Sequence, residues 1–303
     1  MALIAPWIRQ LTGARSTLTR YRICNTCGLG WSSIKYTERE LENLYSHYRK
    51  QKYFQIRNSW EPSYTEALNE ALDGNLDFQR TRREFLTSLV GRVDPGFISR
   101  AKVVLDIGGG HGRVIPDWHS LTKKYVLEVS DSETIPGIVK VKTWAELPRS
   151  ESIDLVMACG ILEHLNDPNY FLKELGTKTQ SIGAPKSKEK ALFYFEVPSG
   201  TPAPRKNWLL FSALFCAKNR LLWRRYDKIP SLRKSKLFPL RIAEHIQFFN
   251  IPSLKILLEK SGFHVLTIEE YDSMVFLPAK AGVRFDLGVA AVATFGPNTI
   301  PPN

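Results

Sequence analysis

A glycine-dense turn after a short apolar run constrains this sequence more than any other feature. Residues 103–107 read Val-Val-Leu-Asp-Ile and are followed by Gly-Gly-Gly-His-Gly. An apolar run of this length indicates a buried strand, and glycine lets the backbone take positive φ and approach a ligand closely. The pattern therefore predicts a strand, a ligand-holding loop and a helix over about 112–121, whose first N–H groups would face the ligand.

The spacing of the glycines separates this loop from the dinucleotide fingerprint G-x-G-x-x-G. Gly108, Gly110 and Gly112 alternate, and Arg113 stands where that fingerprint has its third glycine. An acid, Asp106, lies two residues before the first glycine. A tight turn in another α/β protein would use similar glycines, so the loop by itself leaves both interpretations open.

Composition limits the class of protein and its partners. The 303 residues are 43% hydrophobic and 24% charged, which is ordinary for a globular chain with a sizeable core. The net charge of +12 favours an anionic partner: a phosphorylated or carboxylated substrate, a nucleic acid or a membrane surface. Four cysteines form no dense disulfide framework, and the first residues do not resemble a signal peptide, so we expect a cytoplasmic protein.

Two further strand ends carry polar residues. Residues 124–129 read as the second strand, and Glu128 near its end can accept hydrogen bonds from vicinal ribose hydroxyls, with Asp131 as a nearby alternative. The apolar run 153–159 predicts a central strand. It is followed by Leu-Glu-His-Leu at 162–165 and by Asn166 or Asp167 as the cap of a helix beginning at Pro168.

These segments together resemble class I S-adenosylmethionine (SAM)-dependent methyltransferases. D-x-G-x-G-x-G at 106–112 resembles their first motif, and the Leu-Glu-His-Leu segment with Asp167-Pro168 resembles the fourth motif of the small-molecule and sugar methyltransferases. The resemblance implies an α/β fold with a Rossmann-like seven-stranded sheet and helices on both faces. It also implies SAM as the cofactor, bound by Asp106, Gly108, Gly110, Gly112, Glu128, Trp144 and Gly160. Trp144 would lie beside the adenine, although a packing role explains it equally well.

The N-terminal segment, residues 1–75, precedes the expected methyltransferase domain at 76–303. Cys24-x-x-Cys27-Gly resembles the second half of a zinc-binding module found on sugar methyltransferases, but the first twenty residues contain no cysteine, so we expect no metal. Thr37 and Glu40 predict a capping box. The stretch 53–75 is rich in aromatic and polar residues and reads as a substrate-facing segment or as a connecting loop.

A basic insertion, residues 201–241, carries eleven Lys or Arg residues against one acid, Asp227. Its basic and apolar residues are compatible with a cap that grips an anionic substrate, with peripheral membrane contact through 205–236, or with a helix pair packed on the core. No nucleic-acid-binding motif joins these cations, so we do not expect nucleic acid as the partner.

Methyl transfer to a hydroxyl requires removal of its proton, which suits histidine near neutral pH. His164 is the first candidate base, Glu163 can orient it or contact the substrate, and His245 can enter the same cleft. We expect methylation, favouring oxygen over carbon, of an anionic sugar, glycan or nucleotide-sugar acceptor in polysaccharide biosynthesis. The alternatives are a membrane-associated methyltransferase of a lipid or quinone precursor, at the inner membrane face, and a non-catalytic SAM-fold scaffold of a glycan-assembly complex.

Overall fold

A seven-stranded sheet forms the centre of the fold. The computed structural model describes residues 2–74, 76–182, 190–200, 220–228, 241–271 and 288–296. The strand order is β12-β13-β9-β8-β5-β6-β7, and β13 runs opposite to the other six strands. The strands span Val103–Ile107 (β5), Lys123–Leu127 (β6), Val139–Val141 (β7), Leu155–Cys159 (β8), Leu192–Pro198 (β9), Phe263–Tyr271 (β12) and Gly288–Phe295 (β13). This arrangement confirms the predicted fold class.

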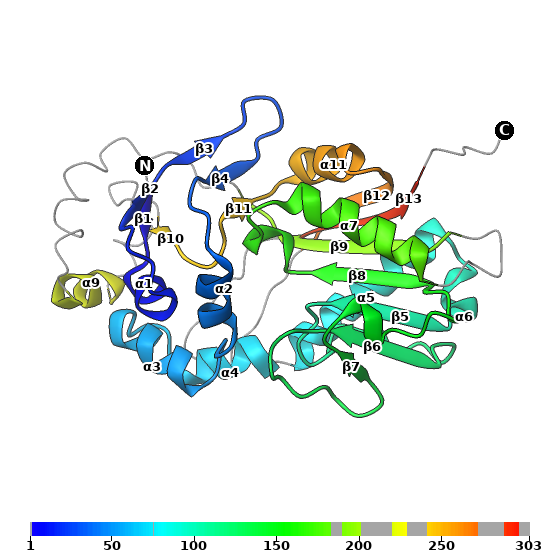
Figure 1. Ribbon diagram of the computed structural model, residues 1–303, viewed down its shortest axis with the longest axis horizontal. Helices are drawn as coiled ribbons and strands as arrows, with labels where there is room; N and C mark the ends of the chain where they lie inside the picture. The colour runs from blue at the N-terminus through cyan, green and yellow to red at the C-terminus, as the bar shows by residue number, and fades with distance from the viewer. Residues whose placement is uncertain are drawn as a thin grey trace.

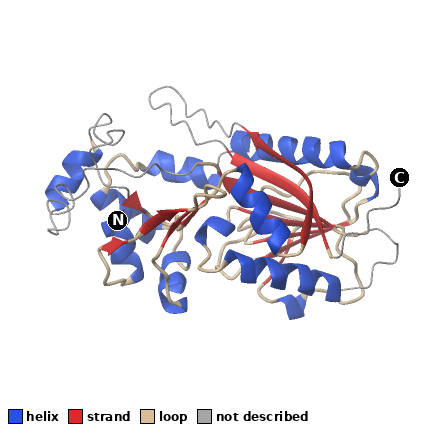
Figure 2. Ribbon diagram, turned by 90° about the horizontal axis from the view of Figure 1, so that it is seen from above, coloured by secondary structure: helices blue, strands red, loops and turns tan. Residues whose placement is uncertain are grey.

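Helices cover both faces of this sheet (Figures 1 and 2). Helices α5 (Leu76–Val93) and α6 (Phe97–Arg100) pack on one face, and α7 (Pro168–Ser181) and α11 (Ile251–Lys260) pack on the other. Alternation along β5 sends Leu105 and Ile107 to the core under α7 and α11, and Val104 to the core under α5. Helix α5 precedes β5, the first strand of this sheet along the chain, and Asn250 caps α11.

The connection between β5 and β6 contains no α-helix, so the helix predicted over 112–121 is wrong. The chain instead makes tight turns, in which the N–H of Gly112 bonds the carbonyl of Gly109 and that of Ile115 bonds the carbonyl of Gly112. Pro116 explains the difference, because proline lacks the N–H for a helical bond and disfavours the α conformation of the residue before it. The glycine loop therefore leads into turns rather than into a helix.

The N-terminal segment builds a separate helical and two-sheet layer at one end of the molecule (Figure 1). Its helices are α1 (Pro6–Thr12), α2 (Glu38–Tyr45), α3 (Gln51–Trp60) and α4 (Glu66–Gly74). The capping box of Thr37 and Glu40 at α2 is confirmed. Because α3 and α4 occupy most of residues 53–75, the connecting-loop interpretation of that stretch is wrong.

Residues 241–248 join this N-terminal layer to the rest of the chain. One small sheet has the order β10-β1-β2 and the other β11-β4-β3, so each includes a strand from far along the sequence. The strands span Ala2–Ile4 (β1), Leu18–Thr19 (β2), Tyr21–Ile23 (β3), Gly30–Ser32 (β4), Arg241–Ile242 (β10) and Gln247–Phe248 (β11). The N-terminal layer is consequently completed by the chain that follows the basic insertion.

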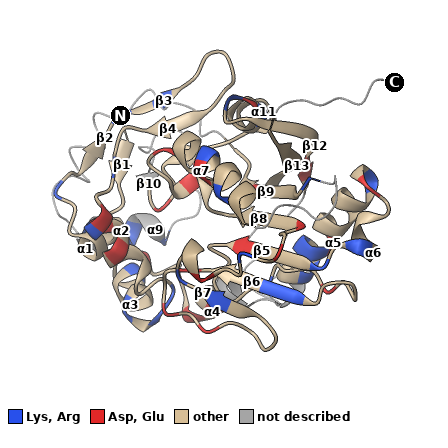
Figure 3. Cartoon of the chain, turned by 45° about the vertical axis from the view of Figure 1, so that its right-hand side comes forward, with Lys and Arg blue, Asp and Glu red and all other residues tan. Residues whose placement is uncertain are grey.

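Most of the predicted basic insertion, 201–219 and 229–240, lies outside the described residues. Its described helix α9 (Arg220–Asp227) packs against α3, with Trp223 buried, Leu221 exposed and Arg224 donating to the carbonyl of Ser59. Figure 3 shows further Lys and Arg residues on α5, α6 and β6, and acids on α2. Within the described ranges, no helix is both long and apolar enough to cross a membrane.

Candidate active site

The glycine loop lies at the carboxyl end of β5, where its backbone conformation requires glycine. Gly108, Gly110 and Gly112 have φ of 62°, 54° and 77°. A Cβ on Gly112 would lie 2.6 Å from Cδ1 of Ile138, which leaves no room for a side chain. A Cβ on Gly110 would meet nothing within 4 Å. Gly110 therefore borders open space, and a ligand can lie directly against the backbone there.

Glu128 extends from the end of β6 onto this loop. One of its carboxylate oxygens accepts the N–H of Gly110 at 3.1 Å, and the other accepts the N–H of Ser130 at 2.8 Å. Asp131, the alternative acid, is instead exposed and lies 3.6 Å from Nζ of Lys142. The carboxylate held beside the loop is thus that of Glu128, where it can accept the ribose hydroxyls of a nucleoside ligand.

Asp106 lies buried beneath the loop, and its unpaired carboxyl indicates whether the site fits the expected cofactor. Neither of its carboxyl oxygens accepts a hydrogen bond from the described residues. Burial raises the pKa of Asp106 to about 7, opposed by the charge of Arg82, whose Nε donates to Glu196 at 2.6 Å. A buried acceptor without a donor fits SAM, because the cofactor carries a donor-bearing ammonium group as well as ribose hydroxyls.

The two remaining predicted cofactor residues occupy different surroundings. Gly160 follows β8 with φ of 72°, and its N–H donates to the carbonyl of Glu196 at 2.8 Å. Trp144 begins the short helix η1 (Trp144–Glu146) and packs half-buried on the core, with Nζ of Lys178 6.0 Å from its ring centroid. These contacts are those of a packing residue, and the role of Trp144 beside an adenine stays a prediction.

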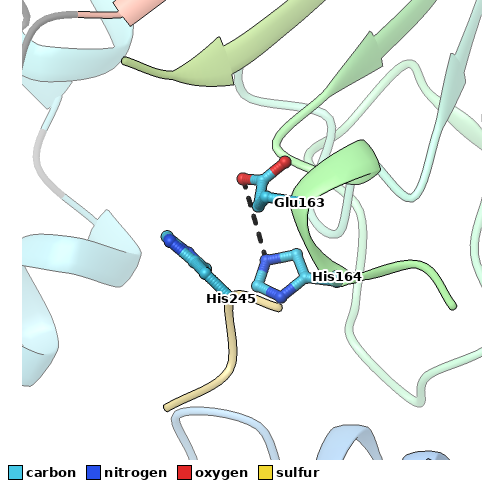
Figure 4. A group of neighbouring side chains, drawn as sticks. All are labelled: Glu163, His164 and His245. Atoms are coloured by element: carbon cyan, nitrogen blue, oxygen red, sulfur yellow. Dashed lines mark ion pairs between the residues drawn. The ribbon is translucent and has the colours of Figure 1, made fainter. Parts of the chain in front are cut away.

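Glu163, His164 and His245, the three predicted catalytic residues, lie together at the carboxyl end of β8 (Figure 4). Glu163 and His164 belong to the short helix η2 (Leu162–His164), and Oε1 of Glu163 lies 3.8 Å from Nε2 of His164. The ring of His245 meets that of His164 edge to face, with centroids 4.7 Å apart. One nitrogen or oxygen from each residue lies within 4.8 Å of the other two.

The hydrogen bonds of this cluster fix the tautomer of His164. Its Nδ1 lies 3.2 Å from the carbonyl oxygen of Glu244, which can only accept, so Nδ1 carries the proton and Nε2 presents a lone pair toward Glu163. Burial, with the neighbouring His245, lowers the pKa of His164 to about 3. His164 is therefore neutral near pH 7 and, by itself, a weak base.

Glu163 is buried and incompletely paired. Its Oε2 accepts no hydrogen bond from the described residues, and burial raises the pKa of its carboxyl to about 8. The backbone around it is fixed, because its carbonyl accepts the N–H of Ile246 at 2.8 Å. The side chain lies with Oε1 3.8 Å from Nε2 of His164 and with Oε2 unpaired among the described residues.

The N-terminal layer supplies the opposite wall of the site. The Tyr45 ring lies edge-on to His164, with centroids 5.8 Å apart. The hydroxyl of Tyr53 is hydrogen-bonded to the Glu244 carboxylate, and Arg57 lies 3.1 Å from the same carboxylate. Although burial raises the pKa of Glu244, Arg57 and His245 lower it to about 2. The sequence analysis missed this network, although Glu244 stands directly before His245 and the 45–64 stretch is rich in aromatics.

Arg49 brings a positive charge and a strained backbone to the same wall. Its φ of 56° is the one positive value among non-glycine residues in the described part of the chain, and such strain is retained where the surroundings enforce it. Its Nη2 lies 3.4 Å from the hydroxyl of Tyr48, and its charge contributes to the lowered pKa of His164. The charge of Arg49 therefore lies near enough to His164 to act on its ring.

The cluster also borders the glycine loop. A Cβ on Gly108 would lie 2.9 Å from Cδ1 of Ile161, the residue that precedes η2. On the far side, Asn166 forms two hydrogen bonds with the backbone of Tyr36, at 3.1 and 2.6 Å, while Asp167 caps α7. The β8 loop is therefore fixed between the cofactor loop and the N-terminal layer.

Cys24 and Cys27 lie in the turn between β3 and β4. Hydrogen bonds from the backbone N–H groups of Cys27 and Thr26 lower the pKa of the Cys24 thiol to about 7. Among the described residues, the two cysteines belong to no group of three Cys, His, Asp or Glu ligands. The resemblance of this turn to half of a zinc-binding module stays a prediction.

Comparisons with known proteins agree with this geometry. A family model described as a methyltransferase domain matches residues 78–268, more than half of the chain. A search of curated proteins gave no significant match. Similar solved structures include magnesium protoporphyrin IX methyltransferase from Synechocystis PCC 6803 with bound S-adenosylhomocysteine, at 13% identity, covering 81% of this chain and 98% of that chain with a TM-score of 0.39.

Two other structures show comparable similarity. The N-methyltransferase NodS from Bradyrhizobium japonicum WM9 is 13% identical, covers 73% of this chain and 98% of its own, and gives a TM-score of 0.36. A SAM-dependent methyltransferase from Archaeoglobus fulgidus is 16% identical, with 70% and 94% coverage and a TM-score of 0.36. These similarities do not identify an acceptor. From the family match over the glycine loop, Glu128 and the β8 loop, the chain belongs to the class I SAM-dependent methyltransferases.

Proposed function

We propose that this methyltransferase transfers a methyl group from SAM to a hydroxyl of a small anionic sugar, as a free sugar phosphate, nucleotide sugar or glycan end. The observation that carries the proposal is the contact between the glycine loop and the β8 loop at Ile161, two residues before Glu163. It sets the Glu163–His164–His245 cluster beside the cofactor loop, where an acceptor hydroxyl must lie to reach the methyl carbon.

The composition of the site supports a hydroxylated and anionic acceptor. The buried oxygens and nitrogens of the cluster can hold a hydroxyl and receive its proton. The charge of Arg49 acts on His164, and the Tyr45 ring beside His164 is of the kind that packs against a sugar ring. The charge and aromatic residues thus favour an anionic sugar over a purely apolar acceptor.

The residues of the chain have separable roles in this reaction. SAM supplies a methyl carbon bound to a positively charged sulfur, which makes that carbon electrophilic. The glycine loop and Glu128 orient the cofactor, and the Glu163–His164–His245 cluster holds the acceptor and takes the proton as the new C–O bond forms and the C–S bond breaks. The first candidate base, His164, has a pKa of about 3 and therefore needs help from its neighbours. We favour transfer to oxygen, and transfer to carbon would use the same cluster.

Incubation of the full chain with 13C-methyl SAM and a panel of sugar phosphates, nucleotide sugars, neutral sugars and quinone precursors tests the proposal. The expected product is a methylated anionic sugar, identified by mass, with a 13C chemical shift typical of an O-methyl group. The His164→Ala variant should bind SAM normally in calorimetry but lose most turnover, whereas His264→Ala, on the exposed side of β12, should keep both. Methylation confined to the quinone precursors, or full turnover by His164→Ala, would contradict the proposal.

A further inference from the structure

Glu163, His164 and His245 have the composition and placement of a metal site. Their ligand atoms lie within 4.8 Å of one another, so some point lies within about 2.8 Å of all three, against about 2.1 Å for bound zinc. Small side-chain rotations close that difference. The three donors come from two segments, η2 and the chain after β10, and converge on one space (Figure 4).

The hydrogen bonds around the cluster are those of ligating residues. Histidines that bind metals donate their other ring N–H to a carbonyl or carboxylate, which fixes the ligating lone pair. His164 does so through Nδ1 to the carbonyl of Glu244, and this leaves Nε2 directed at Glu163. The backbone carbonyl of Glu163 is held in turn by the N–H of Ile246. The first bond fixes the tautomer of His164, and the second fixes the backbone at Glu163, without any ion present.

The cluster also contains an uncompensated acceptor. Glu163 is 3% exposed, and its Oε2 accepts no hydrogen bond from the described residues. When Glu163 is ionised, as metal binding requires, Nε2 of His164 and Oε1 of Glu163 both present lone pairs, and they lie 3.8 Å apart, too far for a direct hydrogen bond. Two acceptors facing each other in a buried space leave a position that a cation can fill.

We propose that Glu163, His164 and His245 bind one divalent transition-metal ion, which holds the hydroxyl of the acceptor beside the SAM loop. Two imidazoles and one carboxylate favour Zn²⁺, Co²⁺, Mn²⁺ or Fe²⁺ over Ca²⁺ and Mg²⁺, which prefer oxygen ligands. Three protein ligands leave open positions for a hydroxyl, and a bound cation polarises that hydroxyl. The role toward the acceptor rests on the proposed function, but the binding of the ion does not.

Co²⁺ titration of the chelator-treated full chain, without SAM or acceptor, tests this site. Visible absorption should report one Co²⁺ per chain with nitrogen and oxygen ligands, and Zn²⁺ should displace it. Glu163→Gln and His245→Ala should each weaken binding by at least about tenfold. The matched controls His264→Ala and Glu259→Gln, both at exposed positions, should leave it unchanged.

Three outcomes would overturn the inference: no stoichiometric Co²⁺ binding by the wild-type chain, binding unaffected by the cluster variants, or sulfur charge-transfer bands that disappear in Cys24→Ser. The wild-type spectrum needs no variant, so misfolding of a variant cannot leave the question open. Methylation is measured separately. Metal binding without methylation of any sugar would reject the proposed function alone, and methylation by a chain that binds no Co²⁺ or Zn²⁺ would reject the metal site alone.

Discussion

The ion pair between Arg82 and Glu196 gives a quantitative test of how the sheet is held together behind the cofactor loop. Nε of Arg82, on α5, lies 2.6 Å from Oε1 of Glu196, on β9, and the two side chains are 13% and 8% exposed. Glu196 also accepts the hydroxyl of Tyr194 at 3.1 Å. Arg82→Leu would remove the countercharge and leave Glu196 buried near Asp106, a second acid.

The expected cost of Arg82→Leu is about 3–5 kcal/mol of unfolding free energy, the typical result of stranding one partner of a buried pair. For a chain of this length that corresponds to a fall in melting temperature of roughly 5–8 °C. Arg80→Leu is the matched control on the same helix, because the pair of Arg80 with Glu84 is 3.7 Å long and 63% and 69% exposed. An exposed helical pair contributes about 0.3–0.5 kcal/mol.

Urea unfolding followed by far-UV circular dichroism measures both variants under the same conditions. The double variant Arg82→Leu/Glu196→Leu should recover most of the loss, because an apolar pair of similar volume often replaces a buried ion pair without cost. Equal losses for Arg82→Leu and Arg80→Leu, both below about 1 kcal/mol, would refute the reasoning, since the buried pair would then behave as a solvated one.

Two further predictions concern the cofactor loop. Because burial raises the pKa of Asp106 from 3.8 to about 7, the folded chain retains this proton while the unfolded chain releases it, and stability falls as the pH rises from about 4 to about 7. Asp106→Asn should therefore stabilise the protein at pH 8, by up to about 4 kcal/mol, and change little at pH 4; equal effects at both pH values in urea titrations would exclude the shift. Gly110→Trp should abolish SAM binding in calorimetry, because the side chain fills the open space beside the loop. The control Gly13→Trp, at the similarly open C-cap of α1, should retain binding. Retained affinity in Gly110→Trp would contradict our placement of the cofactor.

Local sequence signals predicted the glycine loop after β5 and the acid after β6, because each is encoded within a few residues. In the structure, the glycines of 108–112 have the positive φ expected of a loop, and the acid after β6 lies beside that loop. The same local reasoning failed for the helix expected over 112–121, where Pro116 outweighed the usual strand–loop–helix succession. The error matters physically, because the loop offers individual backbone N–H groups and not the dipole of a helix end.

For the proposed acceptor side of the site, the sequence predicted single residues but not their arrangement. His164 and His245 are 81 positions apart, and their ring contact depends on a long-range pairing that no local pattern encodes. Glu244 was missed for the same reason, since its partners Tyr53 and Arg57 lie on α3, nearly two hundred residues earlier. The sequence offered one signal for this network: a charged residue stands directly before a candidate histidine, and the N-terminal segment contains an aromatic-rich stretch.

The pairing of the N-terminal strands with residues 241–248 joins the N-terminal layer to the Glu163–His164–His245 cluster. β1 and β4 take β10 and β11 as partners, so the N-terminal layer is incomplete without residues 241–248. That returning segment carries Glu244 and His245 and donates the N–H of Ile246 to Glu163. Asn166 then bonds the backbone of Tyr36 from the opposite direction. A change that loosens the N-terminal layer must therefore also displace the Glu163–His164–His245 cluster, because the layer and the cluster are held by the same hydrogen bonds.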